Sequence, residues 1–344
     1  MLTPHPLQSM TTTGYIGRRL LQIVPVLLFV VTVTFVLINS IPGDPVRILV
    51  GPAADAAAIE AARAKYGLDQ PLYVRYVRYL AAVATGDFGT SIHYGGVAVT
   101  EKIFERLPVT LLLLASSFTL AIGSAIPLGI FAAKNRNNGY DHLARITSLI
   151  GVSTPSFWVG LLLIIVFAYY GDLLPPSGLV MPWADPASVD GATSRLDVLA
   201  TAASHLILPS ITLGTLQMAA ITRIERSSML EVLNKDYVQL ARAYGVSERT
   251  ILRRQAFKNA QLPVLTVIGI QMTTALGGAV LTETVFNING MGNLIITAVR
   301  AQDYQLIMGT TIFFAIVFVL GVLVVDVLYA VIDPRISYGG GAGE

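Results

Sequence analysis

Residues 236–257, DYVQLARAYGVSERTILRRQAF, form a charged segment between two long apolar runs. The flanking runs, 198–222 and 259–282, contain no Asp, Glu, Lys or Arg. Each is long enough to cross the hydrocarbon of a bilayer, since about 30 Å takes roughly 20 helical residues. Two membrane-length helices joined by a short charged segment are the unit from which the rest of the fold is inferred.

Four further charge-free runs of this length occur at 20–39, 107–133, 146–171 and 304–325. Only 13% of the 344 residues are charged, against about 25% in soluble domains. The first run is too long for a signal peptide and lacks a small-x-small cleavage site, so we interpret it as a retained helix. The sequence predicts an all-α membrane protein with six transmembrane helices.

Basic residues gather in alternate connecting segments, and this bias predicts the orientation. Eight of them lie in 223–258, whereas 172–197 contains only Arg195 and 283–303 only Arg300. Short cytoplasmic loops carry the excess of Lys and Arg, while long segments such as 41–106 are translocated largely regardless of charge. We therefore predict that both termini and residues 236–257 are cytoplasmic.

The predicted division of the chain follows from this orientation. The transmembrane helices are expected at 18–40, 107–133, 146–171, 198–222, 259–282 and 304–332. The cytoplasmic parts are a tail at 1–17, loops at 134–145 and 223–258, and a tail at 333–344. The extracytoplasmic parts are a helical insertion at 41–106 and loops at 172–197 and 283–303. Pro25, Pro127, Pro155 and Pro209 interrupt the spans, which is typical of helices that pack around a pathway.

The outer insertion is expected to contain two helices. An Ala-rich helix closes at Gly67, and a second helix has Asp69 as N-cap and Pro71 in its first turn. Helical spacing places several apolar residues of the second helix on one face, away from Arg75 and Arg78; they are Leu72, Tyr73, Tyr76, Val77 and Leu80. Such a helix suits either the membrane interface or a partner's docking surface.

The 236–257 segment itself predicts two short helices with a glycine joint. Asp236 caps the first, which ends at Gly245, and Ser247 caps the second. We expect apolar residues of this pair to fit a groove on a cytoplasmic partner; they are Val238, Leu240, Ala241, Ala243, Ile251, Leu252 and Phe257. A membrane-anchored DNA-binding helix-turn-helix regulator is the rival hypothesis, but the segment has no room for a domain that frees a recognition helix.

Motifs along nearly the whole chain add a resemblance. They are RRLLQIVPVLL (18–28), IPGDPV (41–46), YGLDQPLYVRYVRYL (66–80), GDFGTSI (86–92), RLPVTLLL (106–113), STPSFWVGLLL (153–163), LILPSITLG (206–214), ARAYGVSERTILRRQAFKNAQLPV (241–264), GGAVLTETVFNINGMGNLI (277–295) and LYAVIDPRISYG (328–339). This ordered set resembles the permease subunits of bacterial ATP-binding-cassette importers, in the oligopeptide/dipeptide branch.

The resemblance implies the fold of such a permease, a bacterial plasma-membrane location and a set of partners. These are a second homologous permease, two cytoplasmic ATPase subunits that bind ATP and Mg, an extracytoplasmic solute-binding protein, and membrane lipid. The imported solute is expected to be an oligopeptide or dipeptide, with glutathione, nickel or another small solute as alternatives. The residues implied to couple to the ATPase are Gln239, Ala241, Arg242, Ala243, Gly245, Glu248, Leu262 and Pro263.

Two positions depart from the family pattern. The broad motif begins Glu-Ala-Ala, where this chain has Gln239-Leu240-Ala241, and Tyr244 stands where a basic residue is often found. The second departure puts one charge contact with the ATPase in question.

The sequence predicts no catalysis by this chain. It has no G-x-x-x-x-G-K-[ST] phosphate loop, no cysteine, and four scattered histidines without ligand-like spacing. Glu283 ends the fifth span and Asp326 lies low in the sixth, and an acid within a membrane is a functional candidate by default. We interpret Asp326, seven residues before Asp333, as an interfacial acid paired with a nearby Arg. A proton-coupled secondary transporter, the third hypothesis, would need such acids near the midplane of several spans. The sequence assigns no residue to the substrate pathway.

Overall fold

The computed structural model describes residues 12–40, 55–65 and 69–332. Within these ranges the chain is helical, apart from turns and one isolated bridge between Thr90 and Ala98. The predictions for Gly67 and for the tail at 333–344 lie outside the described residues, as does the side chain of Asp326.

Within the described ranges, five helical stretches are long and apolar enough to cross a membrane. They are Leu21–Ser40 in α1 (Thr12–Ser40), α5 (Val99–Lys134), α8 (Arg195–Leu233), Glu248–Val285, which ends in α11 (Phe257–Val285), and Tyr304–Val325 in α13 (Tyr304–Ile332). The predicted run 146–171 differs. It is divided between α6 (Gly139–Ser153) and α7 (Ser156–Leu163), which continues as the π-helical η1 (Ile164–Tyr170), and the two halves are bent by 105°.

The bend between α6 and α7 arises at Thr154–Pro155. A residue that precedes proline is disfavoured from the α region, and Thr154 is extended, with φ −90° and ψ 128°. Pro155 has no N–H to continue the hydrogen bonds of α6, so a new helix starts after it. Pro25, Pro127 and Pro209, by contrast, lie inside α1, α5 and α8.

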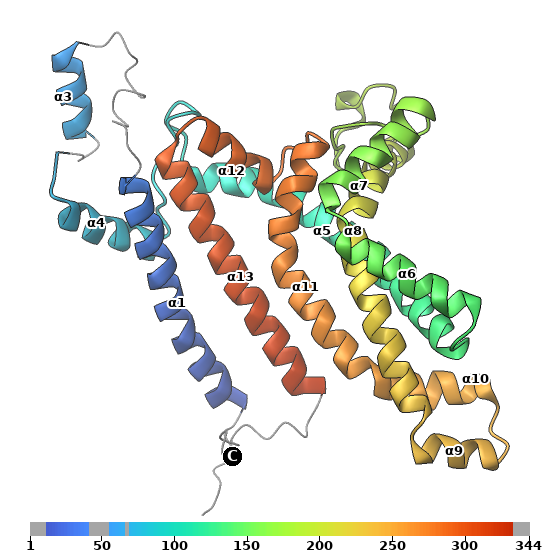
Figure 1. The fold of residues 1–344 in the computed structure, drawn as a ribbon. Coiled ribbons are helices and arrows are strands. Elements are labelled where there is room, and N and C mark those ends of the chain that lie inside the picture. Colours follow the sequence, from blue (N-terminus) through green and yellow to red (C-terminus); the bar gives the residue numbers. More distant parts are fainter. Residues whose placement is uncertain (1–11, 41–54, 66–68, 333–344) are drawn as a thin grey trace, which may run out of the picture. The chain divides into compact units, whose positions relative to one another are not determined.

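The chain divides into two compact units (Figure 1). One comprises residues 1–106 and 294–344, in which α1 packs along α13. The other comprises residues 107–293, in which α8 packs against α6, α7 and α11. Clusters of buried apolar side chains lie along α8 in this second unit, one around Leu208 and Phe286, another around Ile221 and Val264, and a third at its C-terminal end around Met229.

The first unit includes α3 (Ala56–Lys65) and α4 (Leu72–Ala84). The cap predicted at Asp69 is wrong, because α4 starts directly after Pro71 and has no side-chain cap. A loop at 86–96 is fastened to the start of α13 by Asp303, which is buried. Its carboxylate accepts from Ser91 Oγ at 2.5 Å and from the His93 N–H at 3.0 Å.

In the second unit, Glu283 fixes the turn that leads into α12 (Met291–Arg300). Its carboxylate is fully buried and accepts hydrogen bonds from Thr110 Oγ1 at 2.5 Å and from the N–H groups of Gly292 at 2.8 Å and Asn293 at 3.1 Å. Glu283, which the sequence marks only as an acid at a span end, thus accepts hydrogen bonds from a hydroxyl and two backbone amides at a helix N-terminus.

Candidate functional site

The segment between α8 and α11 folds as a helical hairpin. α9 (Asp236–Ala243) follows α8 after a two-residue turn, and a loop at Gly245 leads to α10 (Glu248–Thr250). α10 continues through the π-helical η3 (Ile251–Ala256) into α11 without a break (Figure 1). The two-helix prediction is therefore confirmed for α9 and the joint, whereas the second helix is the beginning of a membrane-length helix.

The caps of the hairpin follow the sequence prediction in part. Lys235, not Asp236, is the N-cap residue of α9, so Asp236 lies in the first helical turn. Ser247 precedes α10 as predicted, although its side chain makes no capping hydrogen bond there.

Gly245 ends α9 in a Schellman motif. Its φ is +77°, a left-handed conformation that glycine adopts without steric cost. The Gly245 N–H donates to the Arg242 carbonyl at 2.9 Å, and the Val246 N–H donates to the Ala241 carbonyl at 3.1 Å. These two bonds are the pair that defines this helix ending. The glycine thus reverses the chain and returns it to the end of α8.

The hairpin is packed onto the helices that carry it. Val238 and Ala241 of α9 enter a buried apolar cluster with residues from the ends of α5, α8, η3 and α11; these are Ala133, Met229, Val232, Leu233, Ile251, Ala256 and Ala260. Val246, next to the glycine, packs against the same cluster. The hairpin and the ends of α5, α8 and α11 therefore share one core.

Polar contacts reinforce this packing. Arg242 Nε donates to Glu248 Oε1 at 2.6 Å across the joint, and Arg242 Nη1 donates to the Leu233 carbonyl at 3.4 Å. Asn259 Nδ2 donates to the Tyr237 hydroxyl at 3.0 Å, which links α9 to α11. The predicted residues Arg242 and Glu248 are thus brought together, and both remain partly exposed.

The exposed face of α9 differs from the predicted apolar set. Val238, Ala241 and Ile251 are buried in the shared core, so they have no surface for a partner. Leu240 and Tyr244 are 57% and 80% exposed, and Gln239 and Ala243 lie exposed beside them. Leu262 is half-buried and Pro263 exposed on α11, two turns beyond the hairpin.

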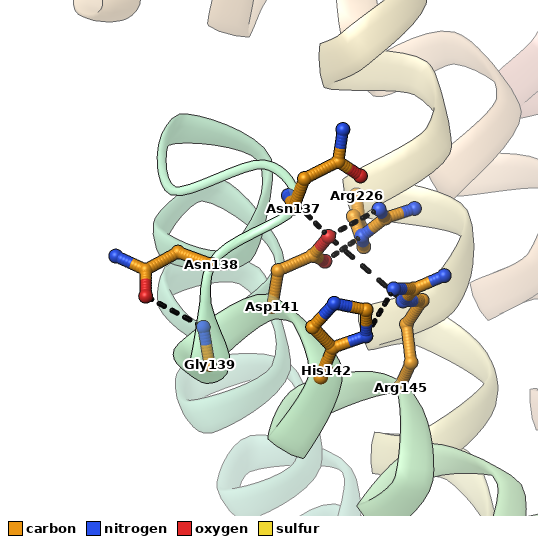
Figure 2. A network of polar contacts seen from close by, with 7 residues as sticks. All are labelled: Asn137, Asn138, Gly139, Asp141, His142, Arg145 and Arg226. Carbon is orange, nitrogen blue, oxygen red and sulfur yellow. Dashed lines mark hydrogen bonds and ion pairs between the residues drawn. The ribbon is translucent and has the colours of Figure 1, made fainter.

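An ion-pair network that sequence reasoning missed joins α6 to α8 beside this hairpin (Figure 2). Asp141 is fully buried and accepts from both Nε and Nη2 of Arg226, the second contact at 2.8 Å. The Asn137 N–H donates to the same carboxylate at 2.9 Å, and Arg145 approaches it at 3.8 Å. The network fixes the loop after α5 against α8.

A second buried acid, Glu225, lies one residue before Arg226 and faces α11. It is fully buried and accepts from Gln261 Nε2 at 3.0 and 3.2 Å. Gly129 of α5 leaves space for the Glu225 side chain. A Cβ atom at position 129 would lie 2.6 Å from the Cβ and Cγ atoms of Glu225. In the sequence, Glu225 and Arg226 look like ordinary charged residues near a span end, because Gln261 and Asp141, which they contact, are 36 or more positions away.

The geometry of the hairpin disfavours binding in a DNA groove and favours the transmission of a rigid-body displacement. The second helix of the apparent helix-turn-helix continues into α11, so it is not free to enter a DNA groove. Among the described residues, His, Asp and Glu side chains form no group that could hold a metal ion. What remains is a rigid projection built onto the ends of three long apolar helices.

Comparisons with known proteins agree with this architecture. Residues 12–115 match the N-terminal family of binding-protein-dependent transport membrane components, and residues 125–338 match the inner membrane component family itself. A chain of the MetNI methionine ABC transporter in an inward-facing conformation has the same fold. It aligns with a TM-score of 0.53 at 14% identity, over 67% of this chain and 96% of that one.

Curated relatives match over nearly their whole length. The chain is 41% identical to the probable D,D-dipeptide transport system permease protein DdpB of Escherichia coli, covering 96% of this chain and all of that protein. It is 39% identical to the oligopeptide transport system permease protein AppB of Bacillus subtilis and to the glutathione transport system permease protein GsiC of Salmonella paratyphi A, each over 94% of this chain and 99% of the relative. The chain therefore belongs to the binding-protein-dependent transport system inner membrane components, as a multi-pass protein of the bacterial plasma membrane.

Proposed function

We propose that this chain is the permease subunit of an ATP-driven importer of oligopeptides or dipeptides, and that the α9 hairpin is where an ATPase subunit drives it. The relatives named for oligopeptides, dipeptides and D,D-dipeptides support the solute class. Glutathione remains the second candidate, because GsiC relatives are nearly as similar. Within the importer, this chain supplies a pathway and its ATPase partners supply the hydrolysis.

A six-span arrangement with both termini cytoplasmic fits the contacts of the second unit. Asp141, at the start of α6, contacts Arg226 near one end of α8. The Ser177 and Gly178 carbonyls, after η1, lie 3.1 and 3.3 Å from His205 Nδ1, closer to the other end of α8. Arg226 and His205 are about 31 Å apart at 1.5 Å per residue, close to the bilayer's hydrocarbon thickness. This separation supports a single crossing by the bent α6–α7 pair as a broken span.

The proposed coupling rests on one observation, the shared core of the hairpin. Because Val238 and Ala241 are buried with residues of α5, α8 and α11, a push on the exposed side of α9 moves these helix ends as one body. A loop held only at its two ends would absorb the same displacement.

The contact with the ATPase is assigned to the exposed residues of the predicted set. Gln239, Arg242, Ala243 and Glu248 would face the partner, with Leu240 and Tyr244 as apolar anchors. Ala241 and Gly245 would act by shaping the hairpin, while Leu262 and Pro263 belong to α11. ATP and Mg would be held by the two ATPase subunits, the solute by an extracytoplasmic binding protein, and the pathway would be completed by a second permease.

An arginine at Ala243 tests the docking surface. Ala243 is exposed, so Ala243→Arg leaves the shared core intact and places a bulky charge where the ATPase would sit. In the assembled transporter reconstituted in proteoliposomes, we expect loss of co-purifying ATPase or of transport per ATP hydrolysed. Ala243→Ser is the matched control and should behave as the parent. The binding protein's affinity for peptide should stay the same in all three.

The outcomes separate the two parts of the proposal. Unchanged assembly and transport in Ala243→Arg would overturn the docking role of α9 and leave the solute assignment untouched. Titration of the cognate binding protein with dipeptides, longer peptides and glutathione decides the solute. Tight binding of glutathione with no binding of peptides would replace the peptide assignment.

A further inference from the structure

α4 presents three chemically different faces. Its first face packs on α1: Thr32 Oγ1 and the Tyr76 hydroxyl are 2.6 Å apart, and the Phe35 ring lies 5.3 Å from the Tyr76 ring and 5.7 Å from the Tyr79 ring. In Figure 1, α4 lies across α1 rather than along it. A helix crossing a membrane span in this way runs roughly parallel to the membrane plane.

The second face is apolar and uncovered. Tyr73 and Val77 are 72% and 61% exposed. Leu80, which is half-buried, and Ala84, which is exposed, follow at helical spacing on the same side. At about 100° per residue, this face points about 100° away from the face that contacts α1. If α4 lies flat beside an upright α1, the apolar face therefore points along the membrane normal.

The third face carries the charges. Arg75 and Arg78 lie about 160° from the apolar face on the same helical wheel. Within residues 12–40, 55–65 and 69–332, neither arginine has an ion-pair or hydrogen-bond partner on its side chain. Partial burial lowers the pKa of Arg75. An arginine that is half-buried without an anion is one that an external anion would stabilise.

The depth of α4 indicates what covers it. Thr32 and Phe35 precede Ser40, the last residue of α1, by five to eight positions, or about 8–12 Å along the helix axis. Around this level, α1 exposes Phe29, Val33 and Val36, as expected of a side facing lipid. α4 therefore lies at the level of this surface, about 8–12 Å inside the end of α1, close to the depth of about 5–10 Å typical of interfacial helices. A soluble binding protein would have to dock below the membrane surface to reach it.

We propose that α4 is an interfacial anchor in the leaflet nearer Ser40, with Tyr73, Val77 and Leu80 among the acyl chains and Arg75 and Arg78 on the phosphates of phospholipid headgroups. The arginine stems can reach outward to the phosphates while the apolar face stays immersed. The anchor would hold the outer end of α1 at a fixed height. This inference depends on α1 being a membrane span and not on the coupling role of α9.

Because the chain contains no cysteine, each cysteine that is introduced is a single labelling site. Single variants Tyr73→Cys, Val77→Cys and Arg78→Cys are spin-labelled in the full chain, reconstituted in vesicles of phosphatidylethanolamine and phosphatidylglycerol. Electron paramagnetic resonance then compares relaxation by oxygen, which enters acyl chains, with relaxation by a water-soluble nickel chelate. A label at Phe29→Cys on α1, where the native side chain is 68% exposed, gives the reference accessibility for lipid. A label at Glu231→Cys, where the native side chain is 71% exposed, gives the reference for water.

Labels at 73 and 77 are expected to match the lipid calibrant, and the label at 78 is expected to shift toward the water calibrant. Nickel access at 73 and 77 equal to that at 231 would overturn the anchor. Shielding of 73 and 77 from nickel only after addition of the solute-binding protein would also overturn it, in favour of a protein docking surface. The arginines are tested with the label at position 77. The double variant Arg75→Gln, Arg78→Gln should change the depth of this label. The double variant Arg75→Lys, Arg78→Lys, which keeps both positive charges, should not. An unchanged depth in the glutamine variant would refute the phosphate contacts.

Discussion

At the scale of single residues, the buried polar groups divide into those with partners and those without. Glu283 and Asp141 are fully buried, and both accept several hydrogen bonds. The Tyr79 hydroxyl is buried and has no partner within the part of the chain that the structure describes. A buried group that lacks a partner costs free energy, whereas a paired one contributes about 1 kcal/mol. The same deletion should therefore have different effects at different sites.

Tyr76 and Tyr79 give a matched test of this difference. Both rings pack on Phe35, but only the Tyr76 hydroxyl forms a hydrogen bond, with Thr32 Oγ1. Tyr76→Phe should weaken the docking of α4 by about 1 kcal/mol, which is roughly fivefold faster hydrogen exchange if α4 exchanges by local opening. Tyr79→Phe should leave exchange unchanged or slower. Equal acceleration in the two variants would mean that the hydroxyl pair contributes nothing.

Glu283 should be more sensitive than either tyrosine. Glu283→Ala leaves two amide groups and the Thr110 hydroxyl buried without their acceptor, at about 1–3 kcal/mol each. We expect the first turn of α12 to lose its exchange protection, while Glu283→Gln, which keeps one acceptor, loses less. Thr284→Ala is the control, because its hydroxyl bonds within its own helix and is exposed. Protection of α12 equal to the parent in Glu283→Ala would show that the cap is dispensable.

At the scale of elements, sequence reasoning was strongest where the signal is local. The apolar runs all correspond to helices, and Gly245 ends α9 with a positive φ as its position predicted. The size of the bend at Thr154–Pro155 was not predictable from the proline alone, because Pro127 and Pro209 also lie within apolar runs and stay inside helices. The buried side of α9 was also missed. Which of its apolar residues turn inward depends on how α5, α8 and α11 meet.

The effect of a substitution at Gly245 should depend only on how readily the new residue adopts a positive φ. No atom lies within 4 Å of a Cβ built there, so size is irrelevant and the φ of +77° decides. Gly245→Asn, which accepts this conformation more readily than other residues do, should keep most transport. Gly245→Ala should destabilise the hairpin by about 1 kcal/mol. Gly245→Pro cannot reach a positive φ and should uncouple hydrolysis from transport in proteoliposomes. Equal transport in the Asn and Pro variants would contradict the role of the Schellman ending.

The attachment of α6 to α8 should depend on one arginine of the two near Asp141. Arg226→Gln leaves a buried carboxylate without its main partner, which typically costs 3–5 kcal/mol. Arg145 is 47% exposed and 3.8 Å away, so Arg145→Gln should cost less than about 1 kcal/mol. Thermal unfolding of the purified chain in detergent compares them. Similar midpoints for the two variants would indicate that Arg226 is not the dominant partner.

At the scale of the whole molecule, the proposed course of the third span rests on where its contacts fall along α8. The long-range partners of α6 and of the segment after η1 are separated in sequence by 85 and by 27 or 28 positions from their contacts on α8. The sequence predicted one span at 146–171, interrupted at Pro155, because hydropathy measures apolar length but does not give the direction of the two halves. The proposed crossing of this region rests on the polar contacts at Arg226 and His205 of α8, which no local pattern encodes.

The broken span can be tested by side-specific labelling. In the cysteine-free chain, Tyr140→Cys marks the start of α6 and Tyr170→Cys the end of η1; these tyrosines are 60% and 78% exposed. If the α6–α7 pair crosses the bilayer, an impermeant maleimide added to intact cells should modify position 170, and position 140 only after permeabilisation. Glu231→Cys, expected inside, and Asp190→Cys, expected outside, serve as references. A re-entrant pair would instead give both positions the same sidedness. The molecule would then have five spans and its two ends on opposite sides, and the placement of α9 beside an ATPase would have to be judged from position 231 alone.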